Sequence, residues 1–178
     1  MRITERTEAG GESDKDLLLR HHVGDAGAMG VLYRRHARFL FLYAVSMTRD
    51  PSLAEDLLQQ AFLKVLTLDS VPRGDSIKGL LCASIRNLMR DGLRKADAER
   101  RHFPRLQAAR PETAPSPEEL EALSRALDQL PPDQREAVTM KCHGDFTFAE
   151  IARILDQPEP TVKSRYRYGI QKLSELLT

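Results

Sequence analysis

The residues with the clearest capacity for chemistry are cations, hydroxyls and an aromatic ring gathered close to the C-terminus. At 100° per residue they fall on one side of a helix, which carries Thr161, Lys163, Ser164, Arg167, Tyr168, Gln171 and Lys172. The opposite side is mainly apolar and carries Val162, Tyr166, Gly169, Ile170, Leu173, Leu176 and Leu177. A helix of this kind suits the major groove of DNA. The alternative is a helical hairpin whose basic face is merely solvated.

A short preceding helix would position this face. Thr147 and Glu150 have the spacing of a capping box, which predicts a helix opening near Phe148. The prolines of DQPEP then interrupt the helical pattern, so that a second helix starts by Pro160 or Thr161. The pattern of residues 147–177 therefore predicts a helix-turn-helix.

Enzymatic and metal chemistry find little support. Cys82 and Cys142 lie far apart, and nothing near the Cys142-His143 pair completes four metal ligands. The sequence also contains no Gly-rich phosphate loop and no nucleophile elbow. We therefore expect no catalytic residues, no metal and no cofactor.

Composition favours an all-α protein that works with a partner. Helix-forming residues are abundant, Trp is absent and alternating β-branched runs are scarce. Charged residues make up 30% of the 178 residues but nearly cancel to a net charge of +1. A protein that binds DNA unaided usually has a larger basic excess, so either another subunit supplies affinity or the charge is unevenly placed. Without a signal-peptide core or a membrane-length apolar run, we expect a cytoplasmic protein that makes no membrane contact.

The chain divides into two small helical domains. Residues 1–12 are polar and predict a disordered tail. Residues 13–101 form the first domain, residues 102–115 a linker with three prolines, and residues 116–178 the second domain. Helix starts within the domains are marked by caps and first-turn prolines at Ser13 or Asp14, Asp50-Pro51, Ser76 and Ser116-Pro117. A longer helix is expected from Asp25 to Met47, and after an interruption at Pro131-Pro132 a further helix covers Gln134 to Cys142.

Two further helical faces in the first domain are candidates for binding. After Ser76, one helix has an arc that carries Arg86, Asn87, Arg90, Asp91 and Arg94. Its basic side continues through Lys95, Arg100 and Arg101, which favours a nucleic-acid surface over a solubilising face. The helix that begins at Pro51 has a polar face with Glu55, Asp56, Gln59, Gln60 and Leu63. That face is either solvated or a partner surface.

The ordered set of motifs resembles the extracytoplasmic-function (ECF) group of bacterial RNA polymerase sigma factors, from Asp14 to Leu177. ALDQLPPDQREAVTMKCHGDFTFAEIARIL followed by TVKSR is similar to region 4 of that family. AEDLLQQAFLKV is similar to region 2.2, and LLCASIRNLMRDGLRK to regions 2.3 and 2.4.

The resemblance implies a subunit that directs promoter-specific initiation without catalysing it. It places the polar face with Glu55, Asp56, Gln59, Gln60 and Leu63 in the helix that docks on the clamp of the large polymerase subunit, with Phe62 assigned to the core. It assigns minus-ten recognition to the arc from Arg86 to Arg94, with loop Thr67 to Asp75 placed to hold a flipped base. Thr161, Lys163, Ser164, Arg165, Arg167 and Tyr168 would read the minus-thirty-five element. An anti-sigma factor is a further possible partner.

Two alternatives stay open, and departures from the family pattern motivate the first of them. Leu80 stands where the family usually has tryptophan, the loop before it is about two residues short, and Tyr168-Gly169 replaces Arg-Ala. The chain could therefore be a sigma-like decoy that binds polymerase without melting promoters. It could also be a stand-alone helix-turn-helix regulator, which would bind duplex DNA without polymerase.

Overall fold

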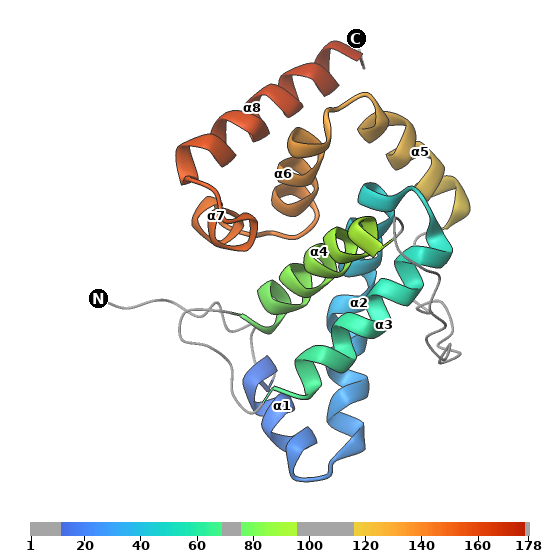
Figure 1. Cartoon of the computed structure of the whole chain (residues 1–178), viewed down its shortest axis with the longest axis vertical. Coiled ribbons are helices and arrows are strands. Elements are labelled where there is room, and N and C mark those ends of the chain that lie inside the picture. Colours follow the sequence, from blue (N-terminus) through green and yellow to red (C-terminus); the bar gives the residue numbers. More distant parts are fainter. Residues whose placement is uncertain (1–11, 69–75, 96–115, 177–178) are drawn as a thin grey trace.

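The computed structural model describes residues 12–68, 76–95 and 116–176, and this part of the chain is all-α, as predicted (Figure 1). Its helices are α1 (Asp14–His22), α2 (Ala26–Thr48), α3 (Pro51–Leu66), α4 (Ile77–Lys95), α5 (Pro117–Asp128), α6 (Pro132–Cys142), α7 (Phe148–Leu155) and α8 (Glu159–Leu176). The predicted linker, most of the predicted tail and most of the loop before Ser76 lie outside the described residues.

Local capping sets several helix starts where the sequence predicts them. Ser13 and Asp16 form a capping box at α1, and Asp50 accepts hydrogen bonds from the Ser52 and Leu53 amides at the start of α3. Asp25 caps α2 in the same way. These side chains satisfy amide groups that the first turn of a helix leaves without partners.

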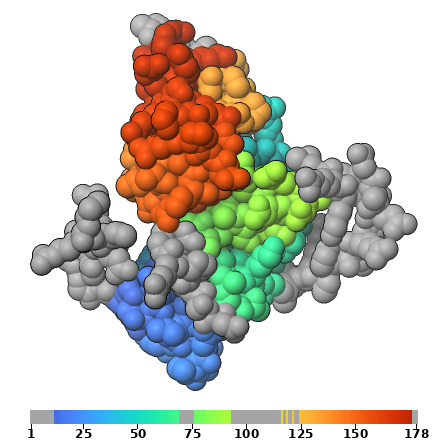
Figure 2. All heavy atoms as spheres, turned by 60° about the vertical axis from the view of Figure 1, so that its left-hand side comes forward, coloured from blue at the N-terminus to red at the C-terminus, as the bar shows by residue number. Residues whose placement is uncertain are grey.

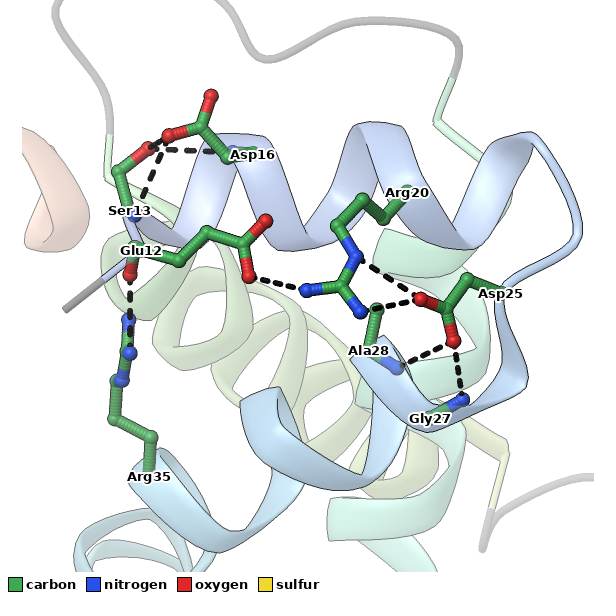
Figure 3. Close-up of polar contacts among 8 residues, drawn as sticks. All are labelled: Glu12, Ser13, Asp16, Arg20, Asp25, Gly27, Ala28 and Arg35. Atoms are coloured by element: carbon green, nitrogen blue, oxygen red, sulfur yellow. Dashed lines mark hydrogen bonds and ion pairs between the residues drawn. The ribbon is translucent and has the colours of Figure 1, made fainter.

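Charged side chains tie α1 to the start of α2 (Figure 3). Arg20 donates from Nε to the Asp25 carboxylate at 2.9 Å and from Nη1 to Glu12 at 2.5 Å. Arg35 donates to the Glu12 carbonyl and also pairs with Asp14. The N-terminal helix is therefore fixed by polar contacts as well as by its buried leucines.

Helices α1 to α4 form an N-terminal lobe, and α5 to α8 form a C-terminal lobe. In the N-terminal lobe, α2 and α3 lie side by side, and the long helix α2 buries most of its second half, from Phe39 to Ser46. In the C-terminal lobe, α6 packs against both α7 and α8. Residues 135 to 140 of α6 are buried on every side of the helix.

The two lobes pack directly against each other. Helix α6 contacts α2, and α7 contacts α4. Figure 2 shows the surface of α7 resting on that of α4. One continuous apolar core runs from Leu17 in α1 to Val162 in α8. Gly144 in the α6–α7 turn permits this approach, because a Cβ atom there would lie 2.7 Å from Cζ of Phe39 and 2.5 Å from the Met140 carbonyl oxygen.

Within the described residues, no helix is both long enough and apolar enough to cross a membrane.

Candidate nucleic-acid and polymerase interfaces

The predicted helix-turn-helix is formed by α7, a tight turn and α8. Thr147 Oγ1 accepts a hydrogen bond from the Glu150 amide at 3.2 Å, and the Glu150 carboxylate accepts one from the Thr147 amide at 2.7 Å. This confirms the predicted capping box. Asp156 ends α7 in the left-handed conformation with φ of 53°, and α8 begins at Glu159, one residue before the predicted start.

The outer face of α8 presents three of its six predicted binding residues to solvent. Lys163, Arg167 and Tyr168 are exposed, whereas Thr161 and Ser164 are half-buried. The Arg167 guanidinium lies 5.1 Å from the centroid of the Tyr168 ring, an arrangement that combines positive charge with a stacking surface. Ser164 Oγ donates within its own helix to the carbonyls of Pro160 and Thr161.

The opposite side of α8 packs on α6, with one departure from the predicted pattern. Val162 and Gly169 are buried as expected, and a Cβ atom on Gly169 would lie 2.7 Å from Cγ2 of Val138. Glycine at this position therefore allows α6 and α8 to approach closely. Ile170, which the sequence pattern assigns to the inner side, is 36% exposed.

Two cations of α8 already have carboxylate partners. Lys163 Nζ lies 2.6 Å from Glu159 Oε1 one turn earlier, and Arg165 Nη2 lies 2.6 Å from Asp133 Oδ2 in α6. Lys163, Glu159 and Asp133 are substantially exposed. Because exposed ion pairs contribute at most about 1 kcal/mol, Lys163 can exchange its carboxylate partner for another anion at little cost.

Two lysine ammonium groups lie near the ring of Phe148, the first residue of α7, and one of them was not predicted from the sequence. Lys141 Nζ lies 5.3 Å and Lys163 Nζ 5.9 Å from the centroid of Phe148. The edge of that ring meets Tyr166, with 5.4 Å between centroids. Lys141 belongs to a different helix from the predicted face, so the helical pattern of α8 alone could not have indicated it.

The predicted minus-ten face on α4 is only partly open. Asn87, Arg90 and Asp91 are exposed, and the side chain of Arg94 lies outside the description. Arg86 instead turns toward the C-terminal lobe, where its Nε lies 3.2 Å from Oε1 of Glu136. Its side chain retains only 21% exposure.

The predicted polymerase face on α3 is accessible. Leu63 is 48% exposed, whereas Glu55, Asp56, Gln59 and Gln60 are each half-buried. The neighbouring Phe62 is 2% exposed and lies against Tyr33, with 5.0 Å between ring centroids. The core assignment of Phe62 is therefore confirmed.

Polar groups that the helical patterns of the sequence do not indicate join the two lobes. Glu136 in α6 is 6% exposed and accepts hydrogen bonds from Tyr43 Oη at 2.7 Å and from Arg86 Nε. Burial and the negative charge of Glu136 raise the pKa of Tyr43 well above its usual value, so its hydroxyl remains a donor. Lys78 Nζ donates to the Gly144 carbonyl, and burial lowers the pKa of this lysine.

Among the residues that the structure describes, no three or more His, Cys, Asp or Glu side chains lie close enough together to hold a metal ion.

Comparison with known proteins relates both lobes to known families. The family model for sigma-70 region 2 matches residues 32–99, and that for sigma-70 region 4 matches residues 120–173. The ECF RNA polymerase sigma factor EcfG of Rhodopseudomonas palustris is 33% identical over 76% of this chain and 77% of its own length. The chain belongs to the ECF family of RNA polymerase sigma factors. It is thus a member of a family of transcription initiation factors that bind DNA, not of an enzyme family.

Two further sigma factors are similar to this chain over most of its length. The ECF sigma factor SigM of Mycobacterium tuberculosis is 34% identical over 93% of this chain and 85% of its own length. The sigma factor CarQ of Myxococcus xanthus is 32% identical over 86% of this chain and 91% of its own length.

Solved structures share the two-lobed fold. CnrH in complex with the cytosolic domain of CnrY matches with a TM-score of 0.69 at 22% identity, covering 93% of this chain and 97% of that one. The sigma factor RpoE of Bartonella quintana, in complex with the anti-sigma factor NepR, matches with a TM-score of 0.61 at 23% identity. That match covers 89% of this chain and 97% of the other.

Proposed function

We propose that this ECF sigma factor binds the RNA polymerase core and directs initiation at promoters that carry its own minus-ten and minus-thirty-five elements. The observation that carries this proposal is the pairing of a region 2 match with a region 4 match in one chain, each including a helix with exposed polar and basic side chains. Its small net charge of +1 fits a subunit that relies on polymerase for much of its affinity for DNA. Such a subunit works in the cytoplasm with polymerase.

Each of the three candidate faces binds a different partner or promoter element. The α3 face with Glu55, Asp56, Gln59, Gln60 and Leu63 docks on the clamp of the large polymerase subunit. The α4 face with Arg86, Asn87, Arg90, Asp91 and Arg94 reads the minus-ten element. The outer face of α8 with Thr161, Lys163, Ser164, Arg165, Arg167 and Tyr168 lies in the major groove of the minus-thirty-five element. An anti-sigma factor is a further proposed partner, because RpoE of Bartonella quintana is bound to one.

Run-off transcription tests the proposed function directly. Promoter candidates come from sequencing the transcripts that appear when the protein is overproduced. With purified core polymerase, we expect a discrete product from such a promoter only when this protein is added. Initiation that is unchanged by its addition would contradict the proposal, and a gel shift by the protein alone on duplex DNA would favour a stand-alone regulator.

Replacing either Lys163 or Arg167 by Ala should weaken promoter binding by the holoenzyme by about 1 kcal/mol and reduce the magnitude of the salt slope by about 1. The reason is that each exposed cation is expected to release counterions from one phosphate. Fluorescence anisotropy of a labelled promoter fragment across a salt series measures both quantities.

Arg34→Ala is the matched control for these variants, since Arg34 is an exposed cation on α2, in the other lobe. It should leave affinity and salt slope unchanged. An unchanged salt slope in both α8 variants would rule out phosphate contacts by Lys163 and Arg167.

A further inference from the structure

Arg167 has a different kind of partner from the other two cations of the predicted α8 face. Lys163 and Arg165 each lie 2.6 Å from a carboxylate oxygen. The Arg167 guanidinium instead lies 5.1 Å from the centroid of the Tyr168 ring, and it forms no ion pair with a carboxylate of the described residues. Its positive charge therefore remains uncompensated beside a ring, whereas the other two cations share theirs with a neighbouring anion.

The contact with the ring turns the Arg167 side chain sideways across the outer face of α8. Successive residues of a helix point about 100° apart, so their side chains do not normally face each other. The guanidinium reaches the ring of the next residue because the arginine side chain is long enough to bend along the helix surface. Arg167 is exposed and Tyr168 is 52% exposed, so packing in the core restrains neither of them. The restraint on Arg167 is the ring itself.

A guanidinium that is held by a ring can still bind an anion. The group has five N–H donors in its plane. Its attraction to a ring arises from its charge, so this contact places no oxygen atom against those donors. An ion pair would occupy at least one donor and would have to be released before a phosphate could take its place. Arg167 can therefore contact a phosphate without first releasing another acceptor.

Tyr168 should lower the cost of ordering Arg167 when DNA binds. A long arginine side chain has many rotamers, and fixing it at an interface opposes association. A tyrosine side chain has only two χ angles and is more rigid. A guanidinium that already lies near this ring in the free protein has less freedom left to lose. Tyrosine in place of the usual arginine at position 168 thus exchanges one potential phosphate ligand for a restraint on its neighbour.

We propose that Tyr168 is a positioning residue, which holds the Arg167 guanidinium in the orientation that binds a phosphate of the minus-thirty-five element. This inference rests on the proposed function, because it assigns a role within the α8 face. The ring acts on DNA through Arg167 and not through a contact of its own. Its removal therefore matters only while Arg167 is present.

A double-mutant cycle in the holoenzyme tests this role. Fluorescence anisotropy with a labelled promoter fragment measures the apparent Kd of full-length variants. Tyr168→Leu removes the ring and should raise the Kd about three-fold, which is the effect expected for an exposed cation–π contact. In the Arg167→Ala background the same substitution should leave the Kd unchanged, since the side chain that the ring holds is gone.

Two further variants serve as controls. Tyr168→Phe keeps the ring and lacks only the hydroxyl, so it should recover the affinity that Tyr168→Leu loses. Lys163→Ala removes a different cation from the same face, one whose Nζ lies near the Phe148 ring. Tyr168→Leu should therefore still raise the Kd about three-fold in the Lys163→Ala background.

Nuclear magnetic resonance of the free protein tests the contact without polymerase or DNA. The ring current of Tyr168 should displace the Nε–H signal of Arg167. The Tyr168→Phe protein should retain this displacement and the Tyr168→Leu protein should lose it, with unchanged helix content by circular dichroism. Equal Arg167 signals in the unmodified and Tyr168→Leu proteins would show that the contact does not form, and would overturn the proposal.

The two measurements distinguish failure of the positioning role from failure of the proposed function. If Tyr168→Leu weakens promoter binding equally with and without Arg167, the ring contacts DNA directly and the positioning role is wrong. The role is also wrong if Tyr168→Leu leaves the Kd of a promoter-binding holoenzyme unchanged. If the contact forms but the unmodified holoenzyme binds no promoter candidate, the proposed function fails, and the role of Tyr168 within it fails as well.

Discussion

Replacing Arg135 by Met should lower the free energy of unfolding by about 3 kcal/mol or more. Arg135 is 4% exposed, and its guanidinium donates to three backbone carbonyls: Leu127 at 3.0 Å, Leu130 at 3.0 Å and Ser46 at 3.1 Å. Methionine fills similar space but donates nothing. Each buried carbonyl left without a donor costs about 1–3 kcal/mol, and water can satisfy only those that it reaches.

The position of these carbonyls explains why an arginine is needed. Ser46 lies in the last turn of α2, and Leu127 in the last turn of α5. The last four carbonyls of a helix lack partners within it, and the negative end of the helix dipole attracts a cation. Arg135 therefore caps two helix ends, one from each lobe. Lysine can reach fewer of these oxygens at once, so Arg135→Lys should give an intermediate loss.

Urea unfolding monitored by circular dichroism measures this effect, with Arg125→Met as the control. Arg125 is an exposed arginine on α5, and its replacement should change stability by no more than about 0.5 kcal/mol. Equal stabilities of the Arg135→Met and Arg125→Met proteins would show that the three carbonyls do not depend on the guanidinium.

Helix starts were predictable from the sequence because they depend on neighbours three residues apart. The capping box of Thr147 with Glu150 and the cap formed by Asp50 before Pro51 are both confirmed. Such interactions form within one turn of chain and need no knowledge of the rest of the fold. The all-α class follows from the same local signals.

The partner of Arg86 was not predictable in this way. A helical pattern indicates which side chains share a face but not what covers that face. Arg86 and Glu136 are 50 residues apart in the chain, and Tyr43 and Glu136 are 93 apart. The helical pattern therefore predicts the arc from Arg86 to Arg94 as one surface, whereas in the structure its first residue faces the other lobe and its middle residues face solvent.

The sequence of α6 did contain a signal for the junction. Two adjacent charged residues, Arg135 and Glu136, are followed there by Ala137, Val138, Thr139 and Met140, and all six residues are buried. A short helix that is covered on every side must place any charged residue against a specific partner, because an unpaired buried charge is costly. The pair Arg135 and Glu136 in the region 4 motif can thus be interpreted on physical grounds as two buried polar groups with specific partners. The domain limits and the individual binding residues stay predictions.

Phe62 and Leu63 are neighbours on α3 whose replacement by Ala should have opposite consequences. Phe62 is 2% exposed and packs on Tyr33, so Phe62→Ala leaves a cavity in the N-terminal lobe. Truncation of a buried phenylalanine costs about 3–5 kcal/mol. Leu63 is 48% exposed, so Leu63→Ala should alter stability by no more than about 0.5 kcal/mol and yet weaken binding to core polymerase.

Urea unfolding and anisotropy with labelled protein and purified core polymerase separate these effects. The Phe62→Ala protein should lose binding only to the extent that it is unfolded, so its affinity should recover with a stabilising osmolyte. The affinity of the Leu63→Ala protein should stay reduced under the same conditions, because the loss is a missing contact and not a missing fold. If Leu63→Ala binds core polymerase as the unmodified protein does, the exposed face of α3 does not include Leu63 in its contact with polymerase. Recovery in both variants would trace both defects to stability alone.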